Sequence, residues 1–218
     1  MKSNVNSKDY WDRRFGTGDW ASKGGFSQTR YFAEAQIPLL GVSSEFEGTL
    51  CDFGCGAGDA FPVYRGAFPR AKLKGVDFSA EAIRLCTERY RELGEFYCGT
   101  VEDVPHSDVI ICSNVIEHID DDVDVVKRLL ERCRKLYVVV PYKEQPLSLE
   151  HLRQYDEDSF AIFNLIRRVV YLSKGWSNYG KDLWVGVYLK NIARAALGRP
   201  LQRQRRQILF EFNGSISK

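Results

Sequence analysis

A glycine-rich stretch at positions 50–60 (LCDFGCGAGDA) is the part of the sequence best suited to bind a ligand. An apolar run leads into Asp52, and three glycines follow at alternate positions: Gly54, Gly56 and Gly58. A strand that turns on glycines into a helix brings backbone N–H groups close to a ligand without interference from Cβ atoms. A dinucleotide fingerprint would need a glycine where Asp59 stands. Since Asp52 and Asp59 would repel a pyrophosphate, the pattern favours a ligand that carries positive charge.

Asp77 ends a second predicted strand, 71–77 (AKLKGVD), 25 residues after Asp52. In a doubly wound sheet, an acidic side chain at the tip of the second strand reaches the ribose hydroxyls of a nucleoside. Asp77 could instead be a turn former before Ser79, which would cap the next helix. Its distance from the glycine turn favours the ribose role, and Phe78 beside it is then expected to contact the same ligand.

A third segment, 107–122 (SDVIICSNVIEHIDDD), carries the residues that could act on a substrate. An apolar run ends at Asn114, and a short helical turn with Glu117 and His118 follows. An imidazole can accept a proton near neutral pH. His118 is therefore the candidate general base, or else a residue that only forms hydrogen bonds within this loop.

Together the motifs CDFGCGAG, KGVDFS, YCGTVEDVP and DVIICSNVIEHI resemble the class I S-adenosylmethionine-dependent methyltransferases, in that family's order and spacing, over positions 49–141. The stretches YWDRRF…GGFSQTRYF and EHLRQY are similar to the subgroup of bacterial surface-polysaccharide and small-molecule pathways. The resemblance implies S-adenosyl-L-methionine as cofactor. It places Asn114 near the methionine moiety and makes His118 the general base. Glu117 would then orient His118 or contact the substrate.

The stretch CGTVEDVP departs from the family pattern at the expected adenine site. Many relatives have an acidic residue two positions after a glycine-like turn, where this chain has Thr100. We therefore expect Thr100 or Glu102 to hold the adenine amino group, with the backbone of Val101 against the ring.

Strand-like and helix-like segments alternate along the chain, which predicts an α/β fold with a parallel sheet. The resemblance implies a doubly wound, mostly parallel seven-stranded sheet whose last strand is antiparallel and lies beside the fifth. The predicted strands are 48–53, 71–77, 94–98, 108–113, 135–140, 168–172 and 207–212. The predicted helices are 58–67, 80–93, 122–133 and 156–164.

At 218 residues and 44% hydrophobic residues, the chain can bury one large core, so we predict one domain, 1–218. It would comprise an N-terminal lid (1–44), a cofactor-binding core (45–141) and a substrate-side segment (142–218). No apolar run approaches the roughly 18 residues of a membrane span, and the N-terminus lacks the apolar stretch of a signal peptide. We expect a cytoplasmic protein whose six cysteines are mostly buried and reduced.

Residues 181–206 form a basic insertion before the last predicted strand, with seven lysines and arginines against one aspartate. Apolar residues recur at roughly helical spacing, which predicts an amphipathic helix. The favoured interpretation is a helix docked on the core with a solvated basic face. The alternatives are contact with an anionic membrane surface, an anionic substrate or glycolipid, or nucleic acid.

One alternative concerns a metal. The pattern Asn114-x-x-Glu117-His118 followed by His151 resembles the metal site of methyltransferases that act on the 2′-hydroxyl at RNA 3′ ends. Those enzymes have a second glutamate where this chain has Asn114, which supplies no charge for a hard cation. We therefore predict a site without metal.

The predicted activity is O-methylation of a sugar, glycan precursor or other small metabolite. The alternatives are a metal-dependent RNA 2′-O-methyltransferase, a protein or nitrogen methyltransferase, and a non-catalytic cofactor-binding scaffold. A small-molecule or glycan acceptor is the expected partner, and nucleic acid is a less favoured one.

Overall fold

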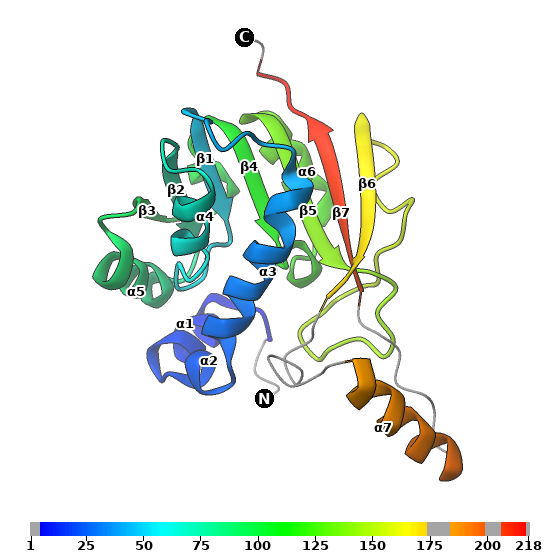
Figure 1. Cartoon of the computed structure of the whole chain (residues 1–218). Helices are drawn as coiled ribbons and strands as arrows, with labels where there is room; N and C mark the ends of the chain where they lie inside the picture. The colour runs from blue at the N-terminus through cyan, green and yellow to red at the C-terminus, as the bar shows by residue number, and fades with distance from the viewer. Residues whose placement is uncertain (1–4, 174–183, 199–205, 217–218) are drawn as a thin grey trace.

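The computed structural model of the chain describes residues 5–173, 184–198 and 206–216. Its described part contains a seven-stranded sheet with the strand order β3-β2-β1-β4-β5-β7-β6 (Figure 1). The strands are β1 (Thr49–Phe53), β2 (Lys72–Asp77), β3 (Glu95–Cys98), β4 (Ser107–Ser113), β5 (Cys133–Pro141), β6 (Leu165–Leu172) and β7 (Arg206–Asn213).

The strand directions confirm the predicted topology. Strands β1 to β5 pair in parallel, whereas β7 runs antiparallel to both β5 and β6. The last strand thus lies beside the fifth, with Val139 opposite Leu209. Because parallel neighbours end at the same edge, the carboxyl ends of β1, β2 and β4 bring their loops together there.

The helices are α1 (Lys8–Gly16), α2 (Asp19–Ser22), α3 (Gly25–Leu40), α4 (Phe61–Ala67), α5 (Ala80–Tyr90), α6 (Asp122–Leu130) and α7 (Trp184–Ala196), with short 3₁₀ turns η1 (Val101–Asp103) and η2 (Ile116–His118). Side-chain caps fix several helix starts. The Ser79 hydroxyl accepts a hydrogen bond from the Ala82 N–H, as predicted for α5, and Ser7 caps α1 in the same way.

Helices cover both faces of the sheet, and β5 shows why the sheet needs both layers. Tyr137 and Val139 pack with α3, α4 and α5, whereas Leu136 and Val138 pack with α6 and Phe160 on the other face. Successive side chains of a strand point to opposite faces, so a strand between two layers must be apolar at every position. The continuous apolar run of β5 follows from this double burial.

One expectation about the elements was wrong. Residues 156–164 form turns rather than a helix, because the Asp156 carboxylate accepts hydrogen bonds from the Asp158 N–H and the Ser159 hydroxyl and so competes with helical backbone bonding. The predicted lid also divides in two. Only α1 and α2 lie beyond the strand ends, while α3 packs along one face of the sheet through Ala33 and Leu40 (Figure 1).

The predicted amphipathic helix of the basic insertion is present as α7, although residues 181–183 and 199–205 lie outside the described part of the chain. The apolar side chains of Leu189 and Ile192 are 58% and 52% exposed. Figure 1 shows α7 apart from the sheet. This helix is therefore not docked on the core through those two side chains, contrary to the favoured interpretation.

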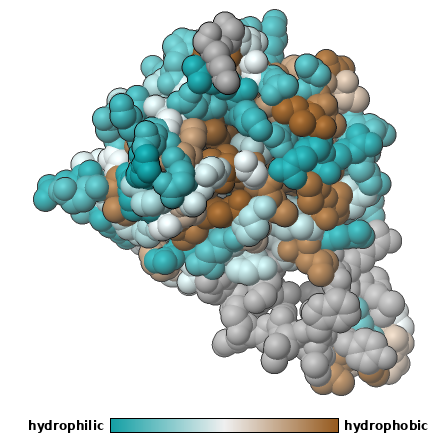
Figure 2. Space-filling model, turned by 45° about the horizontal axis from the view of Figure 1, so that its top comes forward, coloured by the Kyte–Doolittle hydropathy of each residue, from teal (hydrophilic) through white to brown (hydrophobic). Residues whose placement is uncertain are grey.

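The described helices include none that is both long and apolar enough to cross a bilayer. Hydrophobic side chains nevertheless reach the surface in several places between hydrophilic ones (Figure 2). On the edge strand β6 every second residue is exposed, including Ile166, Val170 and Leu172. Five of the six cysteines are buried and all six are free, with Cys98 the exposed one.

Candidate functional site

The predicted ligand loop follows β1, and its glycines are required by backbone geometry. Gly54, Gly56 and Gly58 all have positive φ angles, of 75°, 53° and 76°. A Cβ atom on Gly54 would also lie 2.2 Å from Cγ2 of Val115, at the start of the next loop. The loop after β1 can therefore approach the loop after β4 only because position 54 lacks a side chain.

Asp77 lies at the tip of β2 and holds this loop in place. Its carboxylate accepts hydrogen bonds of 2.9 Å from the N–H groups of Gly56 and Ser79. Burial outweighs these two bonds and raises the pKa of Asp77 to about 6. Each carboxylate oxygen has a second acceptor position, which can accept a hydrogen bond from a ribose hydroxyl as predicted.

The two loop carboxylates do not share the role predicted for them. Asp52 faces the cavity described below, and burial together with the charge of Asp77 raises its pKa to about 8. Asp59 instead points toward α5, where it accepts a hydrogen bond from the Tyr90 hydroxyl and lies 3.5 Å from Arg89. Of the carboxylates at the glycine loop and the β2 tip, Asp52 and Asp77 thus line the cavity, and Asp59 is outside it.

A cavity of about 1560 Å³ opens at the carboxyl ends of the strands. Walls come from α1, α3, the loops after β1, β2 and β4, the segment 141–152 and the start of β7. The sequence-predicted residues that line it are Asp52, Gly54, Gly56, Asp77, Phe78, Thr100, Val101, Asn114, Glu117, His118 and His151. The structure therefore brings together nearly every residue that the motifs singled out.

Gly58 and Glu102 are the two predicted cofactor residues that do not line the cavity. A Cβ on Gly58 would meet the Cys86 sulfur at 2.9 Å and the Tyr90 ring at 3.0 Å, so this glycine allows α5 to pack closely. Glu102 is exposed and forms ion pairs with Arg128 and Arg132. Thr100 and Val101 line the cavity instead, and the adenine contact stays a prediction.

Helix α1 forms one wall of the cavity and is tied to both sides of it. Asp12 accepts a 2.6 Å hydrogen bond from the Ser79 hydroxyl at the start of α5. Tyr10 and Arg14 both donate to the carboxylate of Glu150, in the segment opposite. With α1 tied to both sides of the cavity, Trp11 and Phe15 line the cavity.

Asn114 follows β4 in the left-handed conformation, with φ of 57°. Its backbone N–H donates to the Val139 carbonyl oxygen at 2.8 Å, and its side-chain oxygen accepts from Gln207 at 2.6 Å. The Asn114 side-chain N–H₂ donates to the Ser113 hydroxyl at 3.0 Å. Asn114 is therefore fixed by β5 and β7 at the cavity wall.

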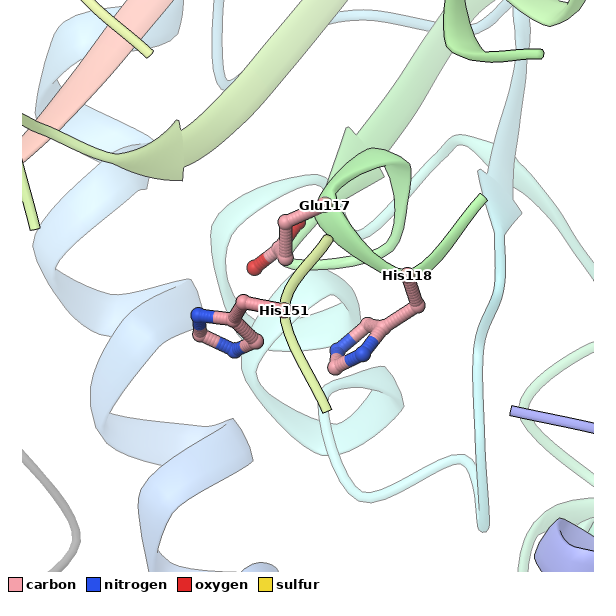
Figure 3. Close-up of side chains that lie close together, drawn as sticks. All are labelled: Glu117, His118 and His151. Atoms are coloured by element: carbon pink, nitrogen blue, oxygen red, sulfur yellow. The ribbon is translucent and has the colours of Figure 1, made fainter. Parts of the chain in front are cut away.

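Glu117, His118 and His151 lie close together at the cavity (Figure 3), and Glu117 and His118 follow β4, which is separated from β2 by β1 in the sheet. One potential ligand atom from each residue lies within 4.8 Å of the other two. The rings of His118 and His151 have centroids 5.0 Å apart, and Trp11 packs edge-on against His118 at 5.3 Å. No hydrogen bond joins the Glu117 carboxylate to His118 in the described part of the chain, and the Nδ1 atom of His118 lies 3.1 Å from the Glu150 carbonyl oxygen.

The three groups differ in how burial affects them. Burial raises the pKa of Glu117 to about 7 and lowers the pKa of His118 to about 4. Burial also disfavours the charged form of His151, but its hydrogen bond with Glu144 and the nearby Glu117 charge outweigh this and raise its pKa. At neutral pH His118 is therefore a neutral imidazole and a weak proton acceptor.

Sequence reasoning missed Glu144, Glu150 and Gln207 at the cavity. Each acts on a residue that a motif did identify: Glu144 binds the His151 ring, Glu150 binds α1, and Gln207 binds Asn114. Glu150 stands beside His151 in EHLRQY and could have been included with it. Nothing in the sequence links Gln207 to Asn114, which are 93 positions apart.

Comparisons with known proteins agree with this geometry. Residues 51–137 match the family model described as a methyltransferase domain. The trans-aconitate 2-methyltransferase of Afipia carboxidovorans is 28% identical over 99 residues, which cover 44% of this chain and 37% of that protein. The chain matches less than half of the length of each of the three curated relatives compared, all trans-aconitate 2-methyltransferases.

Solved structures are similar in fold. The Haemonchus contortus phosphoethanolamine N-methyltransferase 2, solved with phosphomonomethylethanolamine and S-adenosylhomocysteine, has a TM-score of 0.63 at 14% identity, covering 95% of this chain and 58% of that one. The plantazolicin methyltransferase BpumL, solved with S-adenosylhomocysteine, has a TM-score of 0.59 at 14% identity and covers 96% of both chains. At these identities the likeness is one of fold.

Proposed function

We propose that this chain, a member of the class I S-adenosylmethionine-dependent methyltransferases, transfers the cofactor's methyl group to an oxygen atom of a small-molecule acceptor. The observation that carries the proposal is the cavity itself. In it, the glycine loop, Asp77 and the loop after β4 meet at the carboxyl ends of adjacent parallel strands. A nucleoside ligand binds at this position in doubly wound sheets.

The cofactor would lie along the β1 and β2 ends of the cavity. Asp77 would accept hydrogen bonds from the ribose hydroxyls, with Phe78 and Val101 beside the adenine ring. Near the glycine loop, Asp52 offers a carboxylate to the positively charged methionine end. A buried carboxylate whose pKa is raised ionises more readily when a cation binds beside it, so cofactor binding would lower the pKa of Asp52.

The transfer step is an in-line displacement at the methyl carbon. An acceptor oxygen forms a bond to this carbon as the carbon–sulfur bond breaks, and S-adenosylhomocysteine leaves with its sulfur neutral. Since the cofactor already carries its leaving group, the protein must mainly align the two reactants and exclude water. The rings of Trp11 and Phe15 in the α1 wall would provide part of this exclusion.

The acceptor would lie between the loop after β4 and the segment 141–152. A carboxylate acceptor is already ionised and needs no general base, whereas a hydroxyl must lose its proton. The relatives' name, trans-aconitate 2-methyltransferase, supports a small acceptor with oxygen nucleophiles. A sugar or glycan hydroxyl also stays a candidate, and for it the general-base role of His118 stays a prediction.

The test has two stages. Calorimetric titration should show one binding site for S-adenosylmethionine and one for S-adenosylhomocysteine that compete with each other. Mass spectrometry should then find a single methyl group added to a member of a panel of small carboxylic acids, sugars and sugar nucleotides, with short RNA and peptides as comparison. Absence of cofactor binding would contradict the proposal. Cofactor binding without transfer to any acceptor would favour the non-catalytic scaffold. Transfer to RNA or peptide would show that the acceptor is a macromolecule and not a small molecule.

For α7, contact with an anionic substrate or membrane surface remains a prediction. Arg194 of this helix lines the cavity, which supports the anionic substrate. Flotation with anionic and neutral liposomes at low and high salt would test the membrane alternative, because such binding weakens as salt screens it.

A further inference from the structure

We propose that Glu117, His118 and His151 form a binding site for one divalent transition-metal cation. The three residues come from two segments, with Glu117 and His118 on η2 and His151 on the segment opposite (Figure 3). Their ligand atoms lie within 4.8 Å of one another. A bound cation with ligands at roughly 2.0–2.2 Å brings its donor atoms to about 3–4 Å apart, so small side-chain rotations would suffice.

The first supporting observation is the state of Glu117. Glu117 is only 1% exposed, yet it lines the cavity. Neither of its carboxylate oxygens has a hydrogen-bond partner from another described residue. Buried polar groups are almost always paired, and an isolated carboxylate is costly to bury. A cation between Glu117 and the two histidines would provide the missing partner.

The second observation is independent of the first and concerns the outer side of each imidazole ring. Nδ1 of His151 is bonded to the Glu144 carboxylate, and Nδ1 of His118 lies 3.1 Å from the Glu150 carbonyl oxygen. A histidine that binds a metal normally donates its other ring N–H to a carboxylate or a backbone carbonyl, which fixes the ring. Both kinds of partner are present here, so Nε2 of each ring is left to bind a cation.

The donor set also selects the kind of cation. Two imidazoles and one carboxylate suit Mn²⁺, Fe²⁺, Co²⁺ or Zn²⁺, whereas Mg²⁺ prefers oxygen ligands. The amide of Asn114 is already hydrogen-bonded to Gln207 and Ser113, and the proposed ligand set does not include it. The remaining coordination positions would face the cavity. There, if the proposed function holds, an acceptor oxygen could occupy one of them.

This site changes two sequence-based expectations. We predicted no metal, because Asn114 in a ligand position would make a poor Mg²⁺ site, but the structure assembles a set without Asn114. The inference also excludes His118 as the general base. With Nδ1 facing a carbonyl oxygen and Nε2 bound to a cation, neither nitrogen of His118 would be free to accept a proton.

The experiment measures cation binding directly. Full-length protein freed of metal with a chelator is titrated with Mn²⁺ by electron paramagnetic resonance. Mn²⁺ is the probe because thiolate sites, which the free cysteines could offer, have little affinity for it. We expect one Mn²⁺ per chain, and at least about tenfold weaker binding in Glu117→Gln and in His151→Ala. Glu144→Gln, which leaves the ligands intact but removes the partner of His151, should weaken binding by about ten- to a hundredfold.

His106→Ala is the matched control, because His106 is the one histidine of the sequence that is not in the cluster, and it is exposed. It should bind Mn²⁺ as the wild type does. No bound Mn²⁺ in the wild type, or binding unchanged in both Glu117→Gln and His151→Ala, would overturn the inference. Titration of S-adenosylmethionine into the same metal-free wild type separates the two proposals. Cofactor binding without Mn²⁺ binding removes only the metal site, and Mn²⁺ binding without cofactor binding removes only the proposed function.

Discussion

The two ends of the cavity are built in different ways. At the proposed cofactor end, Asp52, the glycine loop and Asp77 come from two adjacent strands, and the loop is held by short-range bonds such as Gly54 N–H to the Val76 carbonyl oxygen and Gly56 N–H to Asp77. At the opposite end, His118 meets Glu150 across 32 positions and Tyr10 meets Glu150 across 140. The first end is a local motif with strict backbone requirements. The second exists only when distant segments fold against one another.

The largest expected effect tests the backbone requirement at the cofactor end. Gly54→Ala places a Cβ 2.2 Å from Val115 at a φ of 75°. Left-handed strain costs about 1–2 kcal/mol and overpacking about 1–3 kcal/mol, so unfolding should become easier by roughly 2–5 kcal/mol. Thermal or urea unfolding measures this. Gly18→Ala is the control, because Gly18 has the same φ of 75° with nothing within 4 Å of its Cβ position. An equal decrease in the free energy of unfolding of both variants would show that the contact with Val115 adds no cost of its own.

The next effect concerns the buried charge of Asp52. Its folded-state pKa of about 8 lies above the usual value for an unfolded chain, so the wild type takes up a proton on folding. The stability from this group is complete at low pH and is lost as the pH rises toward 8, by at most about 1.4 kcal/mol per pH unit. Asp52→Asn has no such loss. Its stability relative to wild type, measured without cofactor by urea unfolding, should therefore increase from about pH 5 to about pH 8. A constant difference would mean that Asp52 ionises normally.

A smaller effect is expected for the cofactor contact of Asp77. Charge-assisted hydrogen bonds contribute roughly 1.5–3 kcal/mol, so Asp77→Ala should weaken S-adenosylmethionine binding by about ten- to a hundredfold in calorimetric titration. Asp77 also holds the N–H groups of Gly56 and Ser79, so part of the loss could arise from the loop. Asp77→Asn keeps one acceptor oxygen and should fall between wild type and alanine. Unchanged affinity in Asp77→Ala would remove this residue from the cofactor site.

The smallest effect is expected on α7, outside both ends. Leu189 and Ile192 are more than half exposed, so the double substitution Leu189→Ser and Ile192→Ser should change the free energy of unfolding by no more than about 0.5 kcal/mol. Leu209→Ser in β7 provides the contrast, because Leu209 is fully buried between the sheet and its helices. A loss of several kcal/mol in the α7 variant would mean that the helix docks on the core after all.

Much of the sheet and of the cofactor end could be predicted because their signals are local. A strand buried on both faces must be apolar at every position, and a loop with positive φ angles must use glycine. The predicted strand 135–140 lies within the observed β5, Cys133–Pro141, for the first of these reasons. The prediction of a helix at 156–164 was wrong because it overlooked the side chain of Asp156. This carboxylate accepts hydrogen bonds from the Asp158 N–H and the Ser159 hydroxyl, which favours a turn over a helix.

By itself, the sequence determined the alternation of strands and helices, the glycine turn, and the place of Asp77 at the end of a strand. Only the tertiary structure decided that Asp59 and Glu102 face away from the cavity, because their partners Tyr90 and Arg128 lie on other elements. It also decided that Glu117 is buried with no side-chain hydrogen bond to a described residue, beside two histidines whose Nδ1 atoms already have hydrogen-bond partners. Residue type and spacing fix the course of the backbone within a segment. Which side chains meet depends on how segments far apart in the chain pack, and no local pattern encodes that.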